Sequence, residues 1–220
     1  GGCLRAMLRP VLVFAFTTLF VVVDPIGQVP MFIALTPGLR PAERRAVARR
    51  GVLVAAAVLV AFALGGEPLL RALGISLPAF RIAGGILLLL LAVDMLMARQ
   101  TGLRATTPGE DSESAHRPDV SVFPLAIPLI AGPGALTSVI ILMARTGDDV
   151  AIKAGVIGVL LLVLALTLAC LYLAEVLLRL LGVTGVNVIT RVSGILLAAL
   201  AVQFVADGVL ELWHAAAALS

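Results

Sequence analysis

Charged residues are scarce in this chain of 220 residues: 13% are Asp, Glu, Lys or Arg, 61% are hydrophobic, and the mean hydropathy is +1.14. A soluble domain of this length needs more polar side chains, because much of its surface faces water. The scarcity excludes a soluble globular protein and predicts an integral membrane protein. A membrane-spanning helix needs about 20 residues, so there is room for about six spans and for no separate soluble domain.

Residues that carry metal or acid–base chemistry are also few, with two His and two Cys in the whole chain. Cys3 and Cys170 lie far apart and match no metal-ligand spacing. The sequence contains no Ser–His pair, no HExxH motif and no carboxylates at catalytic spacing. We therefore expect neither an enzyme nor a bound cofactor or metal. We also expect no nucleic-acid partner, since that would require basic residues clustered on one exposed face.

The stretch Asp24-Pro25-Ile26-Gly27-Gln28-Val29-Pro30 interrupts the first apolar run, residues 11–35. A carboxylate is expensive in hydrocarbon, Pro25 removes a backbone donor, and Gly27 loosens the turn. Asp followed by Pro is also typical of a helix start, with the carboxylate as cap and proline at the first helical position. We predict two half-helices that meet near the bilayer centre. Broken backbone at that depth is tolerated only against protein or a wet cavity, so the break is a candidate binding site.

A second break is predicted in the fourth apolar run, at about 121–144, where Gly132-Pro133-Gly134 lies at the midpoint. The second helix is expected to run from Pro41 to Gly65-Gly66. The other spans are expected at about 78–98, 154–174 and 187–207, with amphipathic connectors at 67–77 and 175–186 and a short tail at 211–220. The polar stretch 100–120 is predicted to be a loop.

The two halves of the chain repeat. Leu69-Leu70-Arg71 recurs 108 positions later as Leu177-Leu178-Arg179, and Gly85-Ile86-Leu87-Leu88 recurs 109 positions later, from Gly194. A repeat of three spans forces the second copy to face the opposite way across the bilayer, which is the inverted-repeat architecture of secondary transporters. The predicted fold is an all-α membrane protein with six transmembrane helices in two inverted three-helix repeats, whose broken helices 1 and 4 meet near the midplane. It forms one transmembrane domain, 1–220, with repeat one at about 8–99, the loop at 100–120 and repeat two at about 121–210.

Arginine and lysine predict the orientation. The loops between spans 1 and 2, 3 and 4, and 5 and 6 carry ten basic residues, against six on the other side. Five of the ten lie between Arg40 and Arg50. Basic loops stay in the cytoplasm, so both termini are predicted outside, in the periplasm. The arginine-rich first loop is interpreted as a topology and lipid-headgroup feature.

Several stretches resemble the MarC family: Asp24-Pro25-Ile26-Gly27 with Pro30, residues 124–135, Arg81-Ile82-Ala83-Gly84-Gly85-Ile86, and Ile189-Thr190-Arg191-Val192. The resemblance covers nearly the whole chain. Many members of that family carry Asn where this chain has Asp24. The resemblance implies a bacterial inner-membrane transporter with six spans, and relatives with a function point to small neutral amino acids such as glycine and alanine.

A zwitterionic amino acid needs partners for its carboxylate and its ammonium. Half-helix N-termini offer free N–H groups, here those of Ile26 to Gln28 and of Gly134 to Leu136. The carbonyls of Val23 and Ala131, or the Asp24 carboxylate, are candidates for the ammonium. The predicted substrate-binding residues are Asp24, Pro25, Ile26, Gly27, Gln28, Ala131, Gly132, Pro133, Gly134 and Thr137.

Each site residue also has a structural interpretation. Asp24 would only cap its half-helix, and Pro133 would only kink the span. Thr17, Thr18, Thr137 and Ser138 would bond back to their own backbone. Asp94 and Gln203 occupy equivalent places in the repeat, so they either line a cavity and help coupling or pair with a neighbour such as Arg99. Asp207, His116 and His214 are expected to be solvated.

The sequence thus favours a secondary transporter of small neutral amino acids, coupled to protons because Asp24 and Asp94 are the carboxylates within spans. The partners are then the amino acid, the proton and membrane lipid. The alternative is an exporter of drugs or other small metabolites. That function needs a pocket rich in aromatic residues, and aromatics make up only 5% of the chain. The sequence does not determine the oligomeric state.

Overall fold

The structure is a computed structural model that describes residues 2–97, 125–126, 129–147 and 149–217, with the side chains of 2–8 left undescribed. The described residues are mostly helical and include no strand. The helices are α1 (Gly2–Val23), α2 (Gln28–Leu35), α3 (Pro41–Ala72), α4 (Leu77–Leu96), α6 (Pro133–Ala144), α7 (Val150–Tyr172) and α8 (Ala174–Ala217). The predicted polar loop 100–120 and His116 lie outside the described residues.

Four helices are long and apolar enough to cross a membrane: α3, α4, α7 and α8. The bent pair α1 and α2 raises the number to five if it counts as one span. The helix α6 is apolar but shorter. The prediction of a helical, multi-pass membrane protein is therefore confirmed, while the number of six spans stays a prediction.

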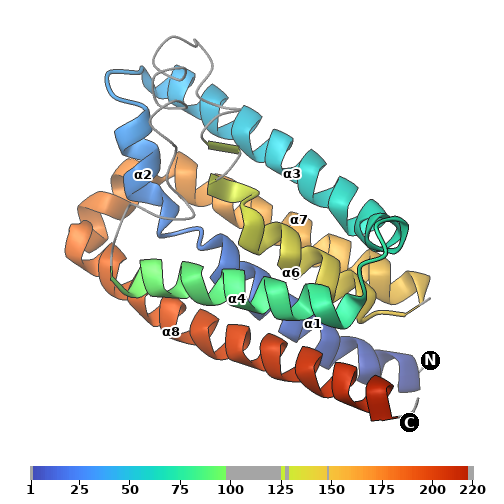
Figure 1. The fold of residues 1–220 in the computed structure, drawn as a ribbon. Coiled ribbons are helices and arrows are strands. Elements are labelled where there is room, and N and C mark those ends of the chain that lie inside the picture. The colour runs from blue at the N-terminus through green and yellow to red at the C-terminus, as the bar shows by residue number, and fades with distance from the viewer. Residues whose placement is uncertain (1, 98–124, 127–128, 148, 218–220) are drawn as a thin grey trace.

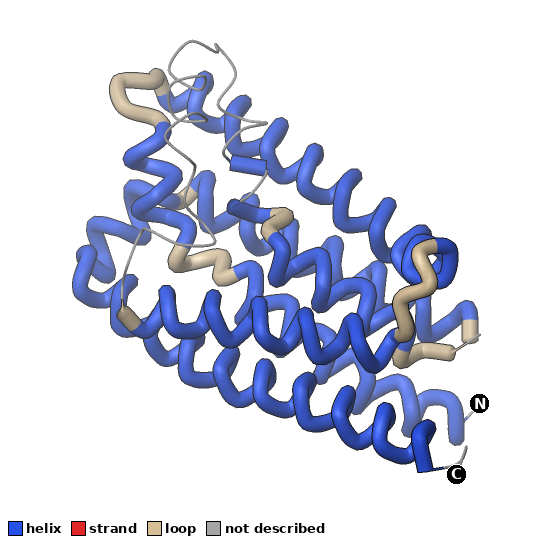
Figure 2. Tube along the Cα trace, viewed as in Figure 1, coloured by secondary structure: helices blue, strands red, loops and turns tan. Residues whose placement is uncertain are grey.

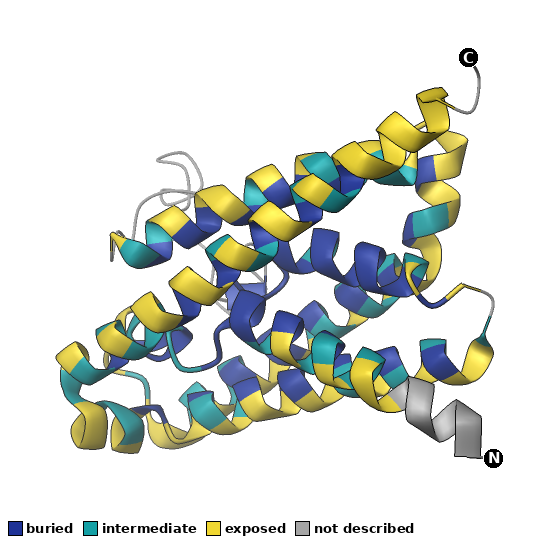
Figure 3. Cartoon of the chain, turned by 90° about the horizontal axis from the view of Figure 1, so that it is seen from below, coloured by how far each residue is buried: buried dark blue, intermediate teal, exposed yellow. Residues whose placement is uncertain are grey.

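Helix α6 lies in the interior of the bundle, as Figure 3 shows by its dark colour among helices that are exposed on their outer faces. It has no charged residue, and it contacts α1, α3, α4 and α7. Its buried residues are Gly134, Ala135, Thr137, Ser138, Val139, Ile140, Ile141, Leu142 and Met143. A helix that is apolar all round is stable only when it is surrounded, so the sequence of α6 accounts for its central place.

Both termini lie at the same end of the bundle (Figure 1). From that end α1 and α2 run away, and α6 runs back toward it. Helices α3 and α7 also run in opposite directions, and so do α4 and the long part of α8. Each helix of the first half therefore runs opposite to its counterpart in the second half.

Local geometry also recurs at the spacing of the sequence repeat. Gly74 (φ 70°) and Gly182 (φ 65°), which follow the two Leu-Leu-Arg segments, both adopt the left-handed conformation. Buried positions of α3 have buried counterparts in α7 at the same spacing in the chain. These pairs are Ala48 and Val156, Val52 and Leu160, Ala55 and Val163, Leu59 and Thr167, and Ala63 and Leu171.

Three predicted helix ends are wrong. Helix α3 passes Gly65-Gly66 and Pro68 and ends at Ala72. A Cβ on Gly66 would lie 2.5 Å from Ile140 Cγ1, so this glycine lets α3 approach α6 and does not end the helix. The predicted connector and the sixth span are two helical segments of α8 that meet at a kink at Gly182, so the span begins after Gly182 and not at Asn187. The predicted tail from 211 is helical to Ala217.

Glycines bring α4 and α8 into backbone contact. A Cβ on Gly85 would lie 2.8 Å from the Ala201 carbonyl oxygen, and a Cβ on Gly208 would lie 2.8 Å from that of Pro78. Small residues allow helices to pack closely where the surrounding lipid offers no hydrophobic drive for association. The close packing of these two helices fixes the wall against which both breaks lie.

Candidate functional site: two adjoining helix breaks

The first break is confirmed at its predicted place. Helix α1 ends at Val23, α2 begins at Gln28, and the two segments are bent by 41°. Figure 2 shows the intervening turn as a loop segment inside the helical bundle. Asp24 has φ 51°, the left-handed region that only Gly, Asn and Asp adopt with ease. The break therefore depends on the type of residue at position 24.

Asp24 caps the turn, but α2 does not begin beside it. The Asp24 N–H donates to the Phe20 carbonyl (2.9 Å), which completes α1, and the Gly27 N–H donates to Asp24 Oδ1 (3.2 Å). The prediction that Pro25 starts the second half-helix is wrong, because residues 25–27 form a turn and Gly27 is the N-cap of α2. Asp24 is only 2% exposed, so its carboxylate lies inside the protein.

Gly27 allows α8 to close over this turn. A Cβ at position 27 would lie 1.9 Å from Asp24 Oδ2 and 2.6 Å from Thr190 Oγ1. Thr190 of α8 therefore lies beside Asp24, a position that we did not predict. Its signal was present in the sequence, since Thr190 belongs to the Ile189-Thr190-Arg191-Val192 stretch that carries the family resemblance.

Gln28 is fully buried at the start of α2, and its Nε2 donates to the Val23 carbonyl. Because a carbonyl can only accept, this bond determines which way the amide faces. Gln28 Oε1 then points elsewhere, and within the described residues it has no hydrogen-bond partner. A buried acceptor left in this way is costly, so Gln28 offers an acceptor to a ligand.

The second break lies where the sequence predicts it. Residues 129–130 form a π-helical turn, Ala131 and Gly132 are non-helical, and α6 begins at Pro133. Proline at the first helical position needs no N–H partner, and its fixed φ suits the helix start. The extended Gly132 (φ −74°, ψ 172°) is the N-cap.

The two breaks adjoin. A Cβ on Gly134, just after the second break, would lie 3.4 Å from Val22 Cγ1, just before the first. It would also lie 3.0 Å from Leu91 Cδ2 and 3.1 Å from Leu88 Cδ2 of α4. The predicted meeting of the two broken segments is therefore present in the bundle interior, with α4 on one side.

Several of the groups that were predicted to contact the substrate are hydrogen-bonded within the protein. The Gly27 N–H is bonded to Asp24, the Gln28 N–H to the Asp24 carbonyl (3.2 Å), and the Val23 carbonyl to Gln28. The Leu136 N–H likewise donates to the Gly132 carbonyl (3.0 Å). Of the predicted contacts, this leaves the N–H groups of Ile26, Gly134 and Ala135 and the carbonyl of Ala131, for which the described residues show no hydrogen bond.

The hydroxyl groups near the breaks differ from one another. Thr17 bonds back to the Val13 carbonyl (2.9 Å), as its structural interpretation predicts. Thr18 and Ser138 are fully buried, and within the described residues their hydroxyls have no hydrogen-bond partner. Thr137 packs against α4, where a Cβ on Gly84 would lie 1.9 Å from its Cγ2. Thr18 and Ser138 are therefore buried polar groups about one turn from Val22 and Gly134 along their own helices.

Gln203 lies away from the breaks. It is exposed on α8 and donates to Asp207 Oδ1 (2.6 Å). Asp207 also pairs with Arg145, whose guanidinium carbon lies 5.2 Å from the Phe14 ring centroid and 5.6 Å from that of Phe204. Asp207 was expected to be solvated, but its side chain is only 25% exposed because the neighbouring helices enclose it. Asp94 is half-buried on α4, and its cavity or coupling role stays a prediction, as does that of Gln203.

Among the described residues, no group of three His, Cys, Asp or Glu side chains could hold a metal ion. The adjoining breaks carry backbone N–H groups at the start of α6, the buried Asp24 carboxylate and the buried Gln28 amide, and two buried hydroxyls lie about one turn away along α1 and α6. These groups suit a small ligand that carries both a donor and an acceptor.

Comparison with known proteins identifies the family. The profile of the MarC family integral membrane proteins matches residues 10–213. A UPF0056 membrane protein of Methanocaldococcus jannaschii is 42% identical over 90% of this chain and 95% of its own length. The UPF0056 membrane proteins YvbG of Bacillus subtilis and YhcE of Escherichia coli are each 36% identical, over 92% and 91% of this chain and 95% and 92% of their own lengths. No solved structure matches. The chain therefore belongs to the MarC family of integral membrane proteins.

Proposed function

We propose that this protein is a secondary transporter of small neutral amino acids of the glycine and alanine type, coupled to protons. The observation that carries the proposal is the contact of Val22 with Gly134, which joins two helix breaks around the buried Asp24. Paired broken helices at the interface of two repeats are the usual substrate site of secondary transporters.

The site can match both charges of a zwitterion. The N–H groups of Gly134 and Ala135 lie at the positive end of α6 and would bind the carboxylate. The Asp24 carboxylate and Gln28 Oε1 would accept from the ammonium. Side-chain atoms of Leu88, Leu91 and Val22 lie within 3.4 Å of the place that a Cβ on Gly134 would occupy. This crowding supports a substrate with a small side chain.

Two features support alternating access. The helices of the two halves run in opposite directions, and Gly74 and Gly182 recur with the same left-handed conformation. These features favour the six-span inverted repeat. In addition, Asp24 is 2% exposed and Gln28 is fully buried, so a ligand can reach them only after helices move. The structure then corresponds to a closed state of the transport cycle.

Asp24 is the group that would carry the coupling proton, since ionisable residues within membrane spans are the usual carriers in proton relays. The proposed location is the bacterial inner membrane with both termini in the periplasm. Among the described residues, few aromatic side chains are fully buried, namely Phe32 and Phe204. An export function for large drugs therefore stays the second candidate.

Ligand binding to the purified protein tests the proposal. A ligand that binds only the folded state raises its melting temperature, so glycine, alanine and serine should stabilise the wild type and a large drug should not. Gly134→Val should abolish this stabilisation, because its side chain would fill the space beside Leu88 and Leu91. Gly158→Val on α7 is the matched control, since a Cβ at position 158 meets nothing within 4 Å. Stabilisation by the drug alone would move the exporter function to first place.

A further inference from the structure

The arginines at the start of α3 divide into two groups. Arg40 and Arg44 are tied to the protein: Arg40 Nε donates to Glu43 Oε1 (3.0 Å), and Arg44 pairs with Glu175 of α8 and donates to the Thr36 carbonyl (3.2 Å). These two side chains therefore have structural partners that account for them.

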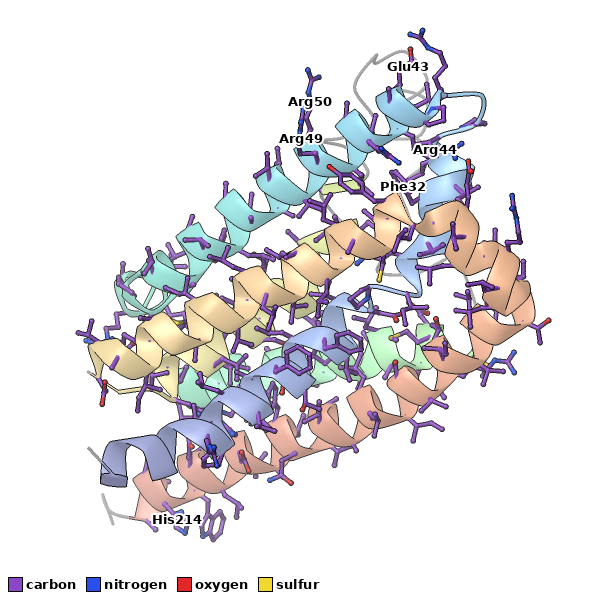
Figure 4. All side chains as sticks on the ribbon, turned by 180° about the vertical axis from the view of Figure 1, so that it is seen from behind. Phe32, Glu43, Arg44, Arg49, Arg50 and His214 are labelled. Atoms are coloured by element: carbon purple, nitrogen blue, oxygen red, sulfur yellow. The ribbon has the colours of Figure 1, made fainter. Side chains whose placement is uncertain are left out.

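Arg45 and Arg49 form the second group. They lie four residues apart, so they share one face of the helix one turn from each other, and both are exposed. Within the described ranges, no carboxylate lies at ion-pair distance from either guanidinium. Figure 4 shows Arg49 and the adjacent Arg50 projecting outward from α3, away from the other helices.

The exposed side of the helix continues as an apolar stripe that winds obliquely around it, since each step of four residues turns by about 40° beyond a full turn. The exposed positions that follow at helical spacing are Leu53, Ala57, Ala61 and Leu64, and Leu53 and Leu64 are 61% and 62% exposed. In a membrane, uncovered leucines of this kind lie against acyl chains. Arg49 is four residues before Leu53, which is about 6 Å along the helix axis, so in a membrane the arginines would lie at headgroup level when the apolar stripe faces acyl chains.

The opposite end of the bundle is arranged differently. There Arg71 pairs with Glu67, Arg81 with Glu211, and Arg145 with Asp207. Arg9 and Lys153 also lie at that end, but on the two different helices α1 and α7, whereas Arg45 and Arg49 lie one turn apart on one helix and can bind one anion together.

We propose that Arg45 and Arg49 bind the headgroup phosphate of an anionic phospholipid, whose acyl chains lie along Leu53, Ala57, Ala61 and Leu64. Guanidinium groups bind phosphate oxygens in a bidentate manner, and an anionic leaflet attracts basic residues at its surface. The apolar stripe below the arginines selects a lipid over a free phosphate. This inference does not rest on the proposed transport function.

The test compares lipid binding by the full-length protein in detergent. Phosphatidylglycerol, phosphatidylcholine and inorganic phosphate are titrated, with bound lipid counted by native mass spectrometry and the melting temperature recorded. Phosphatidylglycerol should bind and stabilise the wild type more than phosphatidylcholine does, and inorganic phosphate should have little effect. The double variant Arg45→Gln, Arg49→Gln should bind phosphatidylglycerol about tenfold or more weakly.

The matched control is the double variant Arg9→Gln, Lys153→Gln, which removes the same charge at the opposite end of the bundle. It should keep the affinity for phosphatidylglycerol, and all three proteins should melt at similar temperatures without lipid. Equal weakening in the control would overturn the proposal, because net charge alone would then explain the binding. The proposal would also be overturned if inorganic phosphate stabilised the protein as much as phosphatidylglycerol does, or if phosphatidylcholine bound equally well. It would fail too if a second copy of the protein covered Arg45 and Arg49 and excluded the lipid.

Discussion

Asp24 combines three properties in one residue: a left-handed backbone, a capping hydrogen bond to Gly27, and near-complete burial. Asn shares the first two because its side chain has the same shape and also tolerates φ > 0. Only the ionisable group distinguishes Asp from Asn here. The capping and the proton-carrying interpretations of Asp24 are thus compatible, and substitutions can separate them.

We predict that Asp24→Asn keeps the stability of the protein but removes the pH dependence of amino-acid uptake into proteoliposomes. Asp24→Ala should lower the stability by about 1–2 kcal/mol, because Ala is strained in the left-handed region and cannot cap the turn. Thermal unfolding and uptake at several pH values measure the two effects. If amino-acid uptake by the Asp24→Asn variant still depends on the proton gradient, Asp24 does not carry the coupling proton.

Among the positions of the site, Gly27 should tolerate an added methyl group least. Gly27→Ala would place Cβ 1.9 Å from Asp24 Oδ2 and 2.6 Å from Thr190 Oγ1, so the carboxylate or α8 must move. We expect loss of ligand-induced stabilisation and a lower melting temperature. The control is Gly65→Ala in α3, where a Cβ meets nothing within 4 Å and alanine should stabilise the helix by up to about 1 kcal/mol. Normal ligand binding by Gly27→Ala would show that the turn is not part of the site.

At the scale of elements, the geometry of the site depends more on how the helices pack against one another than on the sequence of each helix. Helix α4 is packed on α8 through Gly85, Gly194 and Gly208, whose absent side chains let backbone meet backbone. This pair then presents Leu88 and Leu91 to the second break and Thr190 to the first. A change far from the breaks should therefore reach both of them through the shared wall.

We predict that Gly85→Ala destabilises the protein by about 1–3 kcal/mol, the usual cost of overpacking, since its Cβ would lie 2.8 Å from the Ala201 carbonyl oxygen. Gly158→Ala on α7 has open space around its Cβ and should be neutral or slightly stabilising. Thermal unfolding of both variants in the same detergent makes the comparison. Equal melting temperatures would mean that α4 and α8 can separate without cost.

For the whole molecule, the two halves run in opposite directions, and both termini lie at one end. Five of the 16 basic residues lie between Arg40 and Arg50, at the end of the bundle away from the termini. Because short loops rich in Lys and Arg are retained on the cytoplasmic side, the orientation with both termini in the periplasm stays a prediction.

We predict that a reporter active only in the periplasm will be active when fused after Ser220, and that a reporter active only in the cytoplasm will be inactive there. Fusions placed after Gly38, between α2 and α3, should give the reverse result. Opposite activities at both positions would show that the termini face the cytoplasm.

The sequence by itself determined that this is a membrane protein. With 61% hydrophobic residues, the chain has too few polar side chains to cover its surface in water. It also determined where the spans break, since Asp24, Pro25 and Gly132-Pro133-Gly134 change the backbone locally. The family followed from the same stretches. Helix ends were less predictable: Gly65-Gly66 and Pro68 are typical breakers, yet α3 continues through them because packing against Ile140 outweighs local propensity.

Only the tertiary structure decided which groups meet at the breaks. The contact of Val22 with Gly134, and of Gly27 with Thr190, joins residues more than a hundred positions apart, and no local pattern encodes such pairs. Likewise, the Gly27 and Gln28 N–H groups and the Val23 carbonyl were expected to be free, but the turn bonds them internally. A buried polar group must find a partner wherever the fold offers one, and that choice is made by the packing of whole helices and not by the sequence of one.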